Sequence, residues 1–262
     1  VGFAEYYLLR KNQEDLDLAV KYFDFMWAMY CDPNADPFKI TPKENAEVRS
    51  LHSNTNPMVL VSSAQTLRRI TGNTEYYDKI IAKIISDMMT LHYKEDLKCV
   101  LETVYTDGSI LDNPVGRTIN PGHSIENSWF LMNMAVQTKD ETLLKQALNI
   151  LDWSLDIGWD EKYGGIYYSR DVYGRPCEQL EHDMKLWWVH TEAIISAIKL
   201  YRITGKEEYW NDFVMLTDYA FSHFRDGENG EWYGYLRRDG IPTEPVCKGN
   251  VFKGPFHVPR MY

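Results

Sequence analysis

The stretch NPGHSIE at residues 120–126 decides the fold, because its histidine recurs at a fixed interval. His190 follows His123 by 67 residues (190 − 123), and His257 follows His190 by the same interval (257 − 190). Each histidine opens, or lies close to the opening of, a run with the apolar periodicity of a helix. Asn56 lies one interval before His123. Three histidines at one repeat position predict a ring of equivalent sites that face one place.

A turn motif repeats at nearly the same interval. TGNTEYY at residues 71–77 matches TGKEEYW at residues 204–210, and TKDETLL at residues 138–144 lies midway. An apolar run precedes each turn and an amphipathic run follows it, which predicts pairs of helices. The first helix of each pair is apolar nearly all round and should be the inner one. The predicted pairs are Met58–Ile70 with Tyr76–Met89, Ile125–Val136 with Leu143–Leu155, and Ala193–Ile203 with Tyr209–Phe221.

Two helices in every ~66 residues predict an all-α fold, an (α/α)6 toroid or barrel whose inner helices line a cavity. Residues 1–262 are expected to form a single barrel domain of this kind. A closed ring of six hairpins needs about 400 residues at this period, so an incomplete ring is expected, with N-terminal hairpins and the final helix missing. The long connections before the inner helices predict short β-hairpins, with strand signals at Cys99–Tyr105, Gly165–Ser169 and Trp232–Leu236.

The bulk composition is that of an ordinary globular protein, with 44% apolar and 25% charged residues. The formal net charge of −10 argues against nucleic acid or an anionic membrane as the main partner, since both attract basic surfaces. No apolar run approaches the ~18 residues of a membrane span. The four cysteines show no CxxC spacing and are predicted to be reduced thiols in a cytoplasmic protein.

Two carboxylates share a repeat position near the histidines. Glu126 follows His123 by three residues, so their side chains should lie on one helix face. Glu192 lies twelve residues before the threonine of its turn (204 − 192), as Glu126 does (138 − 126). A capped helix N-terminus with an acidic first turn is the structural alternative for His123 and Glu126. Arg260 follows His257 by three residues and adds a cation beside the third histidine.

Histidines that face a cavity, with carboxylates and an arginine but no serine or cysteine nucleophile motif, favour proton transfer. Imidazole serves as acid and as base near neutral pH, so His123 and His257 could remove a proton beside a carbonyl on one side and return it on the other. Arg260 could stabilise the enolate oxygen. Trp187 and Trp188 fit either a packed core or a stacking wall for a sugar.

Three converging histidines could instead bind zinc, which commonly takes three protein ligands in an open catalytic site. Helices around a wide ring keep equivalent residues apart, and the sequence contains no HExxH pattern, so no metal is expected. The remaining histidines do not share the repeat position and are expected at the surface or in packing; they are His52, His92, His182 and His223.

At these motifs the chain resembles the N-acylglucosamine 2-epimerase family, which includes the renin-binding proteins of animals. The likeness is carried by residues 120–126, by MKLWWVHTEA at residues 184–193 and by FKGPFHVPR at residues 252–260, three blocks in order. It extends to NPM at residues 56–58 and to residues 224–236, and so covers essentially the whole chain.

The resemblance implies an (α/α)6 barrel that opens the ring of an amino sugar and interconverts N-acetylglucosamine and N-acetylmannosamine by moving the C2 proton. It implies His123 and His257 as the acid–base pair. It also implies that Glu192 and Arg260 are required and that Glu126 assists His123. Further positions are predicted to bind substrate: His190, Trp187, Trp188, Asn56 and Met58. No catalytic cofactor or metal is implied, ATP or another nucleotide is an expected activator, and a homodimer is expected.

The chain departs from the wider superfamily at one position. Cys99 stands where the sugar isomerases and cellobiose epimerases have a histidine before their Leu-Glu pair, here Leu101 and Glu102. Those relatives often have a glutamine at the position of His190, so His190 favours the N-acylglucosamine branch.

Three other functions remain open. One is an aldose–ketose isomerase for mannose or a related sugar, and another is an inactive, renin-type protease-binding protein. The third is a glycoside hydrolase that uses Glu126 and Glu192 as its two carboxylates, although hydrolysis would leave the histidines unexplained.

Overall fold

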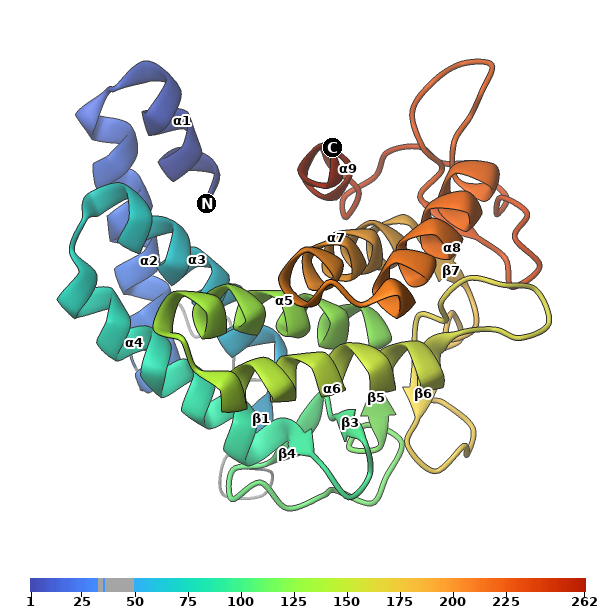
Figure 1. Ribbon diagram of the computed structural model, residues 1–262, viewed down its shortest axis with the longest axis horizontal. Coiled ribbons are helices and arrows are strands. Elements are labelled where there is room, and N and C mark those ends of the chain that lie inside the picture. The colour runs from blue at the N-terminus through green and yellow to red at the C-terminus, as the bar shows by residue number, and fades with distance from the viewer. Residues whose placement is uncertain (33–34, 36–49) are drawn as a thin grey trace. The chain divides into compact units, whose positions relative to one another are not determined.

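The computed structural model describes residues 1–32, 35 and 50–262, which form two compact units (Figure 1). Unit 1 comprises Val1–Tyr93 and Thr103–Leu111, and unit 2 comprises Lys94–Glu102 and Asp112–Tyr262. Both units are built from helices joined by loops that carry short strands. No helix in the described part of the chain combines the length and apolar character that crossing a bilayer requires. The expectation of one barrel domain over residues 1–262 stays a prediction.

Unit 1 contains α1 (Gly2–Arg10), α2 (Gln13–Cys31), β1 (Leu51–Ser53), α3 (Thr55–Thr71), α4 (Thr74–Asp87), the π-helical turn η2 (Met88–His92) and β4 (Thr103–Tyr105). Gly72 ends α3 in a left-handed conformation with a φ of 71°, which glycine adopts without strain. The Asn73 side chain then accepts a hydrogen bond from the backbone N–H of Tyr76 and caps α4. The repeated turn motif therefore works as a helix stop followed at once by a helix start.

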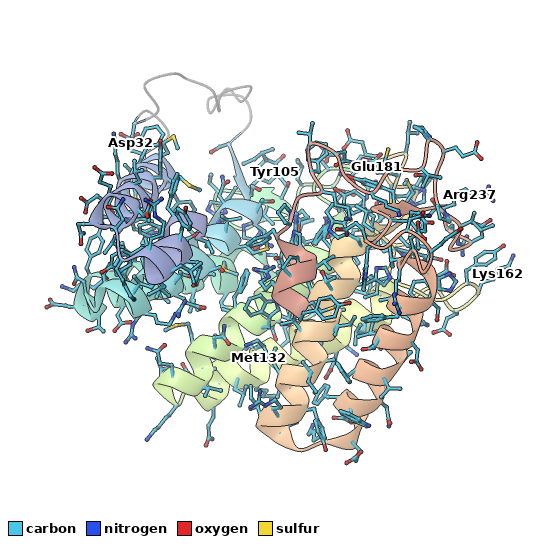
Figure 2. The ribbon with its side chains drawn as sticks, turned by 90° about the horizontal axis from the view of Figure 1, so that it is seen from above. Asp32, Tyr105, Met132, Lys162, Glu181 and Arg237 are labelled. Carbon is cyan, nitrogen blue, oxygen red and sulfur yellow. The ribbon has the colours of Figure 1, made fainter. Side chains whose placement is uncertain are left out.

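Unit 2 contains β3 (Cys99–Val100), β5 (Thr118–Ile119), α5 (Pro121–Thr138), α6 (Glu141–Gly158), β6 (Arg170–Asp171), β7 (Lys185–Leu186), α7 (Trp187–Thr204), α8 (Glu207–His223), β8 (Tyr235–Leu236) and α9 (His257–Met261). The strand β2 (Tyr93–Lys94) pairs with β3. The long loops of unit 2, marked by Lys162, Glu181 and Arg237, gather at one end of its helices (Figure 2).

Burial separates inner from outer helices in unit 2. In α5, 13 of 18 residues are buried, whereas its partner α6 buries six of 18. In α7, 12 of 18 residues are buried, against four of 17 in α8. The prediction that the first helix of each pair is the inner one is therefore confirmed for these two pairs, because only an apolar helix can be enclosed on most sides.

The structural repeat is 66 residues, not the 67 that separate the histidines. The helices α3, α5 and α7 begin at Thr55, Pro121 and Trp187, at intervals of 66 (121 − 55 and 187 − 121). His123 is consequently the third residue of α5, whereas His190 is the fourth residue of α7. One residue turns a side chain by about 100° around a helix. The expected ring of three equivalent histidines is therefore wrong.

The strands lie in the long loops as predicted, but their pairing joins successive loops. In unit 2, β5 pairs with β6 and β7 pairs with β8, both antiparallel. In unit 1, β1 pairs with β4. Only β2 with β3 follows the expected local hairpin among the described sheets. The strand expected at Gly165–Ser169 is displaced, since Ile166 makes an isolated bridge and β6 begins at Arg170.

Candidate active site

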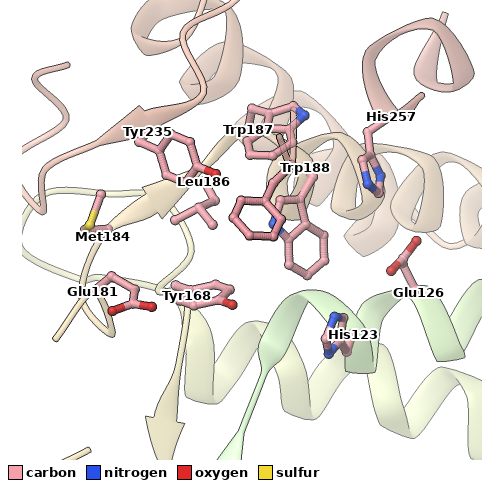
Figure 3. Close-up of a pocket in the computed structure, with 11 residues that line it drawn as sticks. His123, Glu126, Tyr168, Glu181, Met184, Leu186, Trp187, Trp188, Tyr235 and His257 are labelled. Atoms are coloured by element: carbon pink, nitrogen blue, oxygen red, sulfur yellow. The ribbon is translucent and has the colours of Figure 1, made fainter. Parts of the chain in front are cut away.

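A cavity of about 510 Å³ lies in unit 2, at the N-terminal ends of α5, α7 and α9 (Figure 3). Five residues singled out from the sequence line it, and they come from three different helices. Two tyrosines, a methionine and a further glutamate extend the lining away from the histidines. The lining residues are His123, Glu126, Tyr168, Glu181, Met184, Leu186, Trp187, Trp188, Tyr235, Phe252 and His257.

The start of α5 fixes His123. Pro121 occupies the first turn, and the Asn120 side chain accepts a hydrogen bond from the His123 backbone N–H at 3.1 Å. The Nδ1 atom of His123 lies 3.1 Å from the Oε2 atom of Glu102. Because Nδ1 faces this carboxylate, Nε2 is the nitrogen left for a ligand in the cavity.

The charge around His123 favours its protonated form. Burial acts to lower the pKa of His123, but the charge of Glu102, its hydrogen bond and the charge of Glu126 together outweigh burial and raise the pKa. Glu102 was not among the candidate site residues from the sequence. It lies in the loop between β3 and β4, so only the folded chain brings it to His123.

The second histidine is held by a different carboxylate. The Nδ1 atom of His257 lies 2.7 Å from the Oε1 atom of Glu192, a side chain that is fully buried. The other oxygen of Glu192, Oε2, accepts a hydrogen bond from the indole Nε1 of Trp129 at 3.0 Å. His257, the first residue of α9, is thus tied to the middle of two inner helices.

Arg260 bridges the two repeat-related glutamates. Its Nη2 atom donates to Oε1 of Glu126 at 2.8 Å and to Oε1 of Glu192 at 2.5 Å. Burial raises the pKa of Glu126, as does the charge of Glu192, while Arg260 and both cavity histidines act in the opposite direction. Glu126 thus bonds Arg260, whereas the expected partner, His123, bonds Glu102. Stabilisation of an enolate by Arg260 stays a prediction.

Trp188 lies between the two cavity histidines. Its ring centroid is 5.1 Å from that of His123 and 5.7 Å from that of His257. Gly122 makes this position available, because a Cβ atom there would lie 2.5 Å from the Trp188 ring. Trp187 contacts the Tyr235 ring edge-on at 5.5 Å and is buried. The two tryptophans therefore serve both as core and as cavity wall.

The structure does not bring His190 to the cavity. It is fully buried, its Nδ1 donates to the carbonyl of Leu186 at 2.8 Å, and its Nε2 accepts from the backbone N–H of Ile166 at 2.9 Å. Its ring stacks on Tyr219 at 5.2 Å. Burial lowers the pKa of His190 to about 3, which keeps the ring neutral. This histidine packs α7 against a loop and has no nitrogen left for a sugar.

The other two expected substrate contacts lie in unit 1. Asn56 is exposed and Met58 is buried, both in the first turn of α3. Their contact with substrate stays a prediction.

Residues 8–252 match the family model described as N-acylglucosamine 2-epimerase. The chain belongs to the N-acylglucosamine 2-epimerase family. It is similar to the N-acylglucosamine 2-epimerase of Bos taurus, with 37% identity over 205 residues, 78% of this chain and 48% of the relative. The enzyme of Rattus norvegicus is 42% identical over 170 residues, 64% of this chain and 40% of the relative. The chain thus spans less than half the length of these curated relatives.

Solved structures give the same fold. The cellobiose 2-epimerase from Bacillus thermoamylovorans superposes with a TM-score of 0.81 at 19% identity, covering 99% of this chain and 67% of that chain. A D-mannose isomerase superposes with a TM-score of 0.70, also at 19% identity, covering 99% of this chain and 83% of that chain. This likeness confirms the predicted all-α class of the (α/α) barrel type and, at such identity, speaks for the fold alone.

In this member of the N-acylglucosamine 2-epimerase family, the carboxylates beside His257 also have the geometry of a cation site. Ligand atoms of Glu126, Glu192 and His257 all lie within 4.8 Å of one another. The guanidinium of Arg260, however, already donates to both carboxylates at 2.8 and 2.5 Å. A metal ion there would be repelled by this fixed positive charge, so the donor set fits an arginine better than a metal.

Sequence reasoning missed several side chains of this family member's cavity region. Trp129 lies three residues after Glu126 on α5, so helical spacing from a known candidate was a usable signal. Tyr168, Glu181 and Tyr235 come from loops. Their sequence surroundings carry no repeat position, and only the fold brings them to the histidines.

Proposed function

We propose that this chain carries the proton-transfer site of an N-acylglucosamine 2-epimerase, which interconverts N-acetylglucosamine and N-acetylmannosamine. The observation that carries the proposal is the matched arrangement of His123 and His257. Both line one cavity, and the Nδ1 of each faces a carboxylate, so that each leaves Nε2 for the substrate. Family membership and identities of 37 to 42% with curated epimerases support this substrate class.

The reaction needs an acid and a base on opposite faces of one carbon. Opening the sugar ring gives an aldehyde at C1, which makes the C2 proton acidic. One imidazole removes that proton, the C1–C2 double bond forms, and the electrons move to O1. The other imidazolium then protonates C2 from the opposite face, which inverts its configuration. Two histidines in one enclosed site supply both proton transfers with the chain's own side chains.

The two histidines enter this cycle unequally. The raised pKa of His123 suits it to enter as the acid, which leaves His257 as the base that removes the C2 proton first. The carboxylate that orients His257 is shared with Arg260 and Trp129 and is thereby partly neutralised. The roles exchange in the reverse reaction, as microscopic reversibility requires.

A mannose-type aldose–ketose isomerase is the second candidate. The D-mannose isomerase of Marinomonas mediterranea is 28% identical over 177 residues, 63% of this chain and 43% of the relative. That chemistry shares the enolisation but returns the proton to C1 and requires a hydroxyl group at C2. An N-acetylated sugar has no such hydroxyl and is restricted to epimerisation. The higher identity to N-acylglucosamine 2-epimerases favours the epimerase.

Proton NMR of N-acetylmannosamine in D2O, with the protein and ATP, tests the proposal. We expect N-acetylglucosamine to appear with deuterium at C2. Formation of fructose from mannose, without turnover of N-acetylmannosamine, would instead establish the isomerase. Silence with both sugars would contradict both proposals.

The partners and the compartment follow from the same proposal. We infer a cytoplasmic homodimer that ATP or another nucleotide activates away from the cavity. All four cysteines are free thiols, which supports a reducing compartment. Light scattering with and without ATP, together with the rate of C2 exchange, tests the dimer and the activator separately.

A further inference from the structure

We propose that Trp129 is a positioning residue for the base half of the site, acting on His257 through the carboxylate of Glu192. The inference rests on the proposed function, because it assigns to Trp129 the setting of one proton-transfer group. Trp129 lies in the middle of α5 and is 8% exposed, and it does not line the cavity. Its effect on the reaction must therefore pass through another side chain.

The hydrogen bond from Trp129 replaces water at a fully buried carboxylate. The indole Nε1 donates to Oε2 of Glu192 at 3.0 Å, and Glu192 has no exposed surface. Without this donor, a charged oxygen would be left buried and without its partner, which is more costly than the loss of an ordinary hydrogen bond. The donor is thus required for Glu192 to remain a carboxylate in this position.

The same bond divides the two oxygens of Glu192 between separate partners. Oε2 faces Trp129, while Oε1 faces Nδ1 of His257 at 2.7 Å and Nη2 of Arg260 at 2.5 Å. A carboxylate held at one oxygen cannot rotate freely, so the direction of Oε1, and with it the orientation of the imidazole, is fixed. His123 has no share in this arrangement, since its Nδ1 faces Glu102.

Trp129 also contacts the cation of the cluster. The guanidinium carbon of Arg260 lies 5.0 Å from the centroid of the Trp129 ring, within the range of a cation–π interaction. Lys199 of α7 lies over the same ring system at 5.2 Å. One side chain therefore orients both groups that meet at Oε1 of Glu192.

The charged groups that face Glu192 come from α5 and α9. They are Glu126 on α5 and His257 with Arg260 on α9, and Lys199 on α7 adds its charge over the Trp129 ring. Removing only the indole N–H leaves these charges in place. The remaining change is an increase in the basicity of Glu192, which favours the protonated form of its partner His257.

Trp129→Phe tests this effect because it removes the donor and keeps an aromatic ring under Arg260. We expect kcat for C2 exchange to fall about tenfold or more with KM changed less than about threefold, since the loss of a hydrogen bond to a charged group acts on a proton-transfer step. The acid limb of the pH–rate profile should move upward by about one pH unit. A residue with only a packing role would lower thermal stability without moving that limb.

A second variant removes the donor and keeps the shape. Replacing Trp129 with 3-benzothienylalanine exchanges the indole N–H for sulfur, so the ring volume is retained. The same shift of the acid limb is expected at nearly unchanged thermal stability. An acid limb that coincides with that of the wild type in this variant would overturn the proposal.

Trp210→Phe is the matched control. Trp210 lies on α8, is 38% exposed and packs against Tyr201 and Phe213. Its replacement should leave the profile unchanged.

A measurement without turnover separates this inference from the proposed function. Nitrogen-15 NMR of the imidazole groups follows each histidine during a pH titration. In Trp129→Phe, the titration of His257 should move toward higher pH while that of His123 stays in place. This result would support the positioning role even if no sugar were turned over, whereas an unmoved His257 titration would contradict it.

Discussion

His123 Nδ1 lies 3.1 Å from Glu102 Oε2, so the first cavity histidine is oriented by a loop carboxylate and not by its neighbour on the helix. The neighbour, Glu126, is engaged by Arg260 at 2.8 Å. The two histidines consequently rely on separate carboxylates. Each half of the site can therefore be altered without altering the orienting group of the other half.

Glu102→Gln should weaken the acid half of the site. The charge and hydrogen bond of Glu102 raise the pKa of His123, so their loss should lower that pKa. Because the acid must be protonated, the alkaline limb of the pH–rate profile should move to lower pH, and kcat should fall about 10- to 100-fold. Steady-state kinetics over pH check this result. Glu95→Gln, an exposed change in the preceding loop, should leave the profile unchanged.

His123→Ala and His257→Ala should each abolish most C2 proton exchange. A positioned acid or base contributes about 10²- to 10⁴-fold, so each variant should lose a factor in this range. The double variant should be little slower than either single one, because the two groups act in one proton relay. Deuterium incorporation from D2O measures the loss. Exchange at the wild-type rate in both single variants would refute the two-histidine assignment.

His190→Ala should act on stability more than on substrate affinity. The change removes two buried backbone hydrogen bonds and the stacking on Tyr219, and we expect a loss of about 2–4 kcal/mol in the free energy of unfolding. Urea denaturation and KM, measured together, check this. A large rise in KM at unchanged stability would restore the expectation that His190 binds substrate.

Acid should destabilise the protein through His190. In the unfolded chain a histidine takes up a proton near pH 6.5, whereas the buried ring of His190 has its pKa lowered to about 3. This contribution to stability is complete above the unfolded pKa and is lost as pH falls from there toward 3. At pH 5 the loss should be about 2 kcal/mol. Unfolding free energies at pH 7 and pH 5 test it, and His190→Gln should flatten the dependence.

Gly122→Ala should disturb the wall between the histidines. The added Cβ would lie 2.5 Å from the Trp188 ring and 2.8 Å from Val189, so Trp188 must move. We expect a loss of about 1–3 kcal/mol in stability together with reduced kcat. Thermal denaturation and exchange kinetics measure both effects. Gly227→Ala is the control, because no atom lies within 4 Å of a Cβ there.

The sequence predicted the helix pairs well because their signals are local. The turn at residues 71–77 contains its own helix stop, Gly72, and its own cap, Asn73. The inner helices were recognisable because an enclosed helix must be apolar on most faces. The positions of His123, Glu126 and His257 at one cavity also followed from repeat spacing.

The role of His190 could not be predicted from its interval. The spacing between histidines is 67 residues, but the helices that carry the first two repeat every 66, since their starts are set by Pro121 and Trp187. A difference of one residue turns the ring away from the cavity. Glu102 and Tyr168 could not be placed either, because each lies in a loop whose course depends on packing against other segments.

The pairing of strands between successive loops bears on how the substrate range of this scaffold can be engineered. The loop before α5 is joined through β5 to the loop before α7, and that loop is joined through β7 and β8 to the loop before α9. A single loop grafted from a relative would lose its partner strand and expose an unpaired edge. Specificity transfer should therefore succeed with adjacent loops exchanged together, as one module, and fail with loops exchanged one at a time.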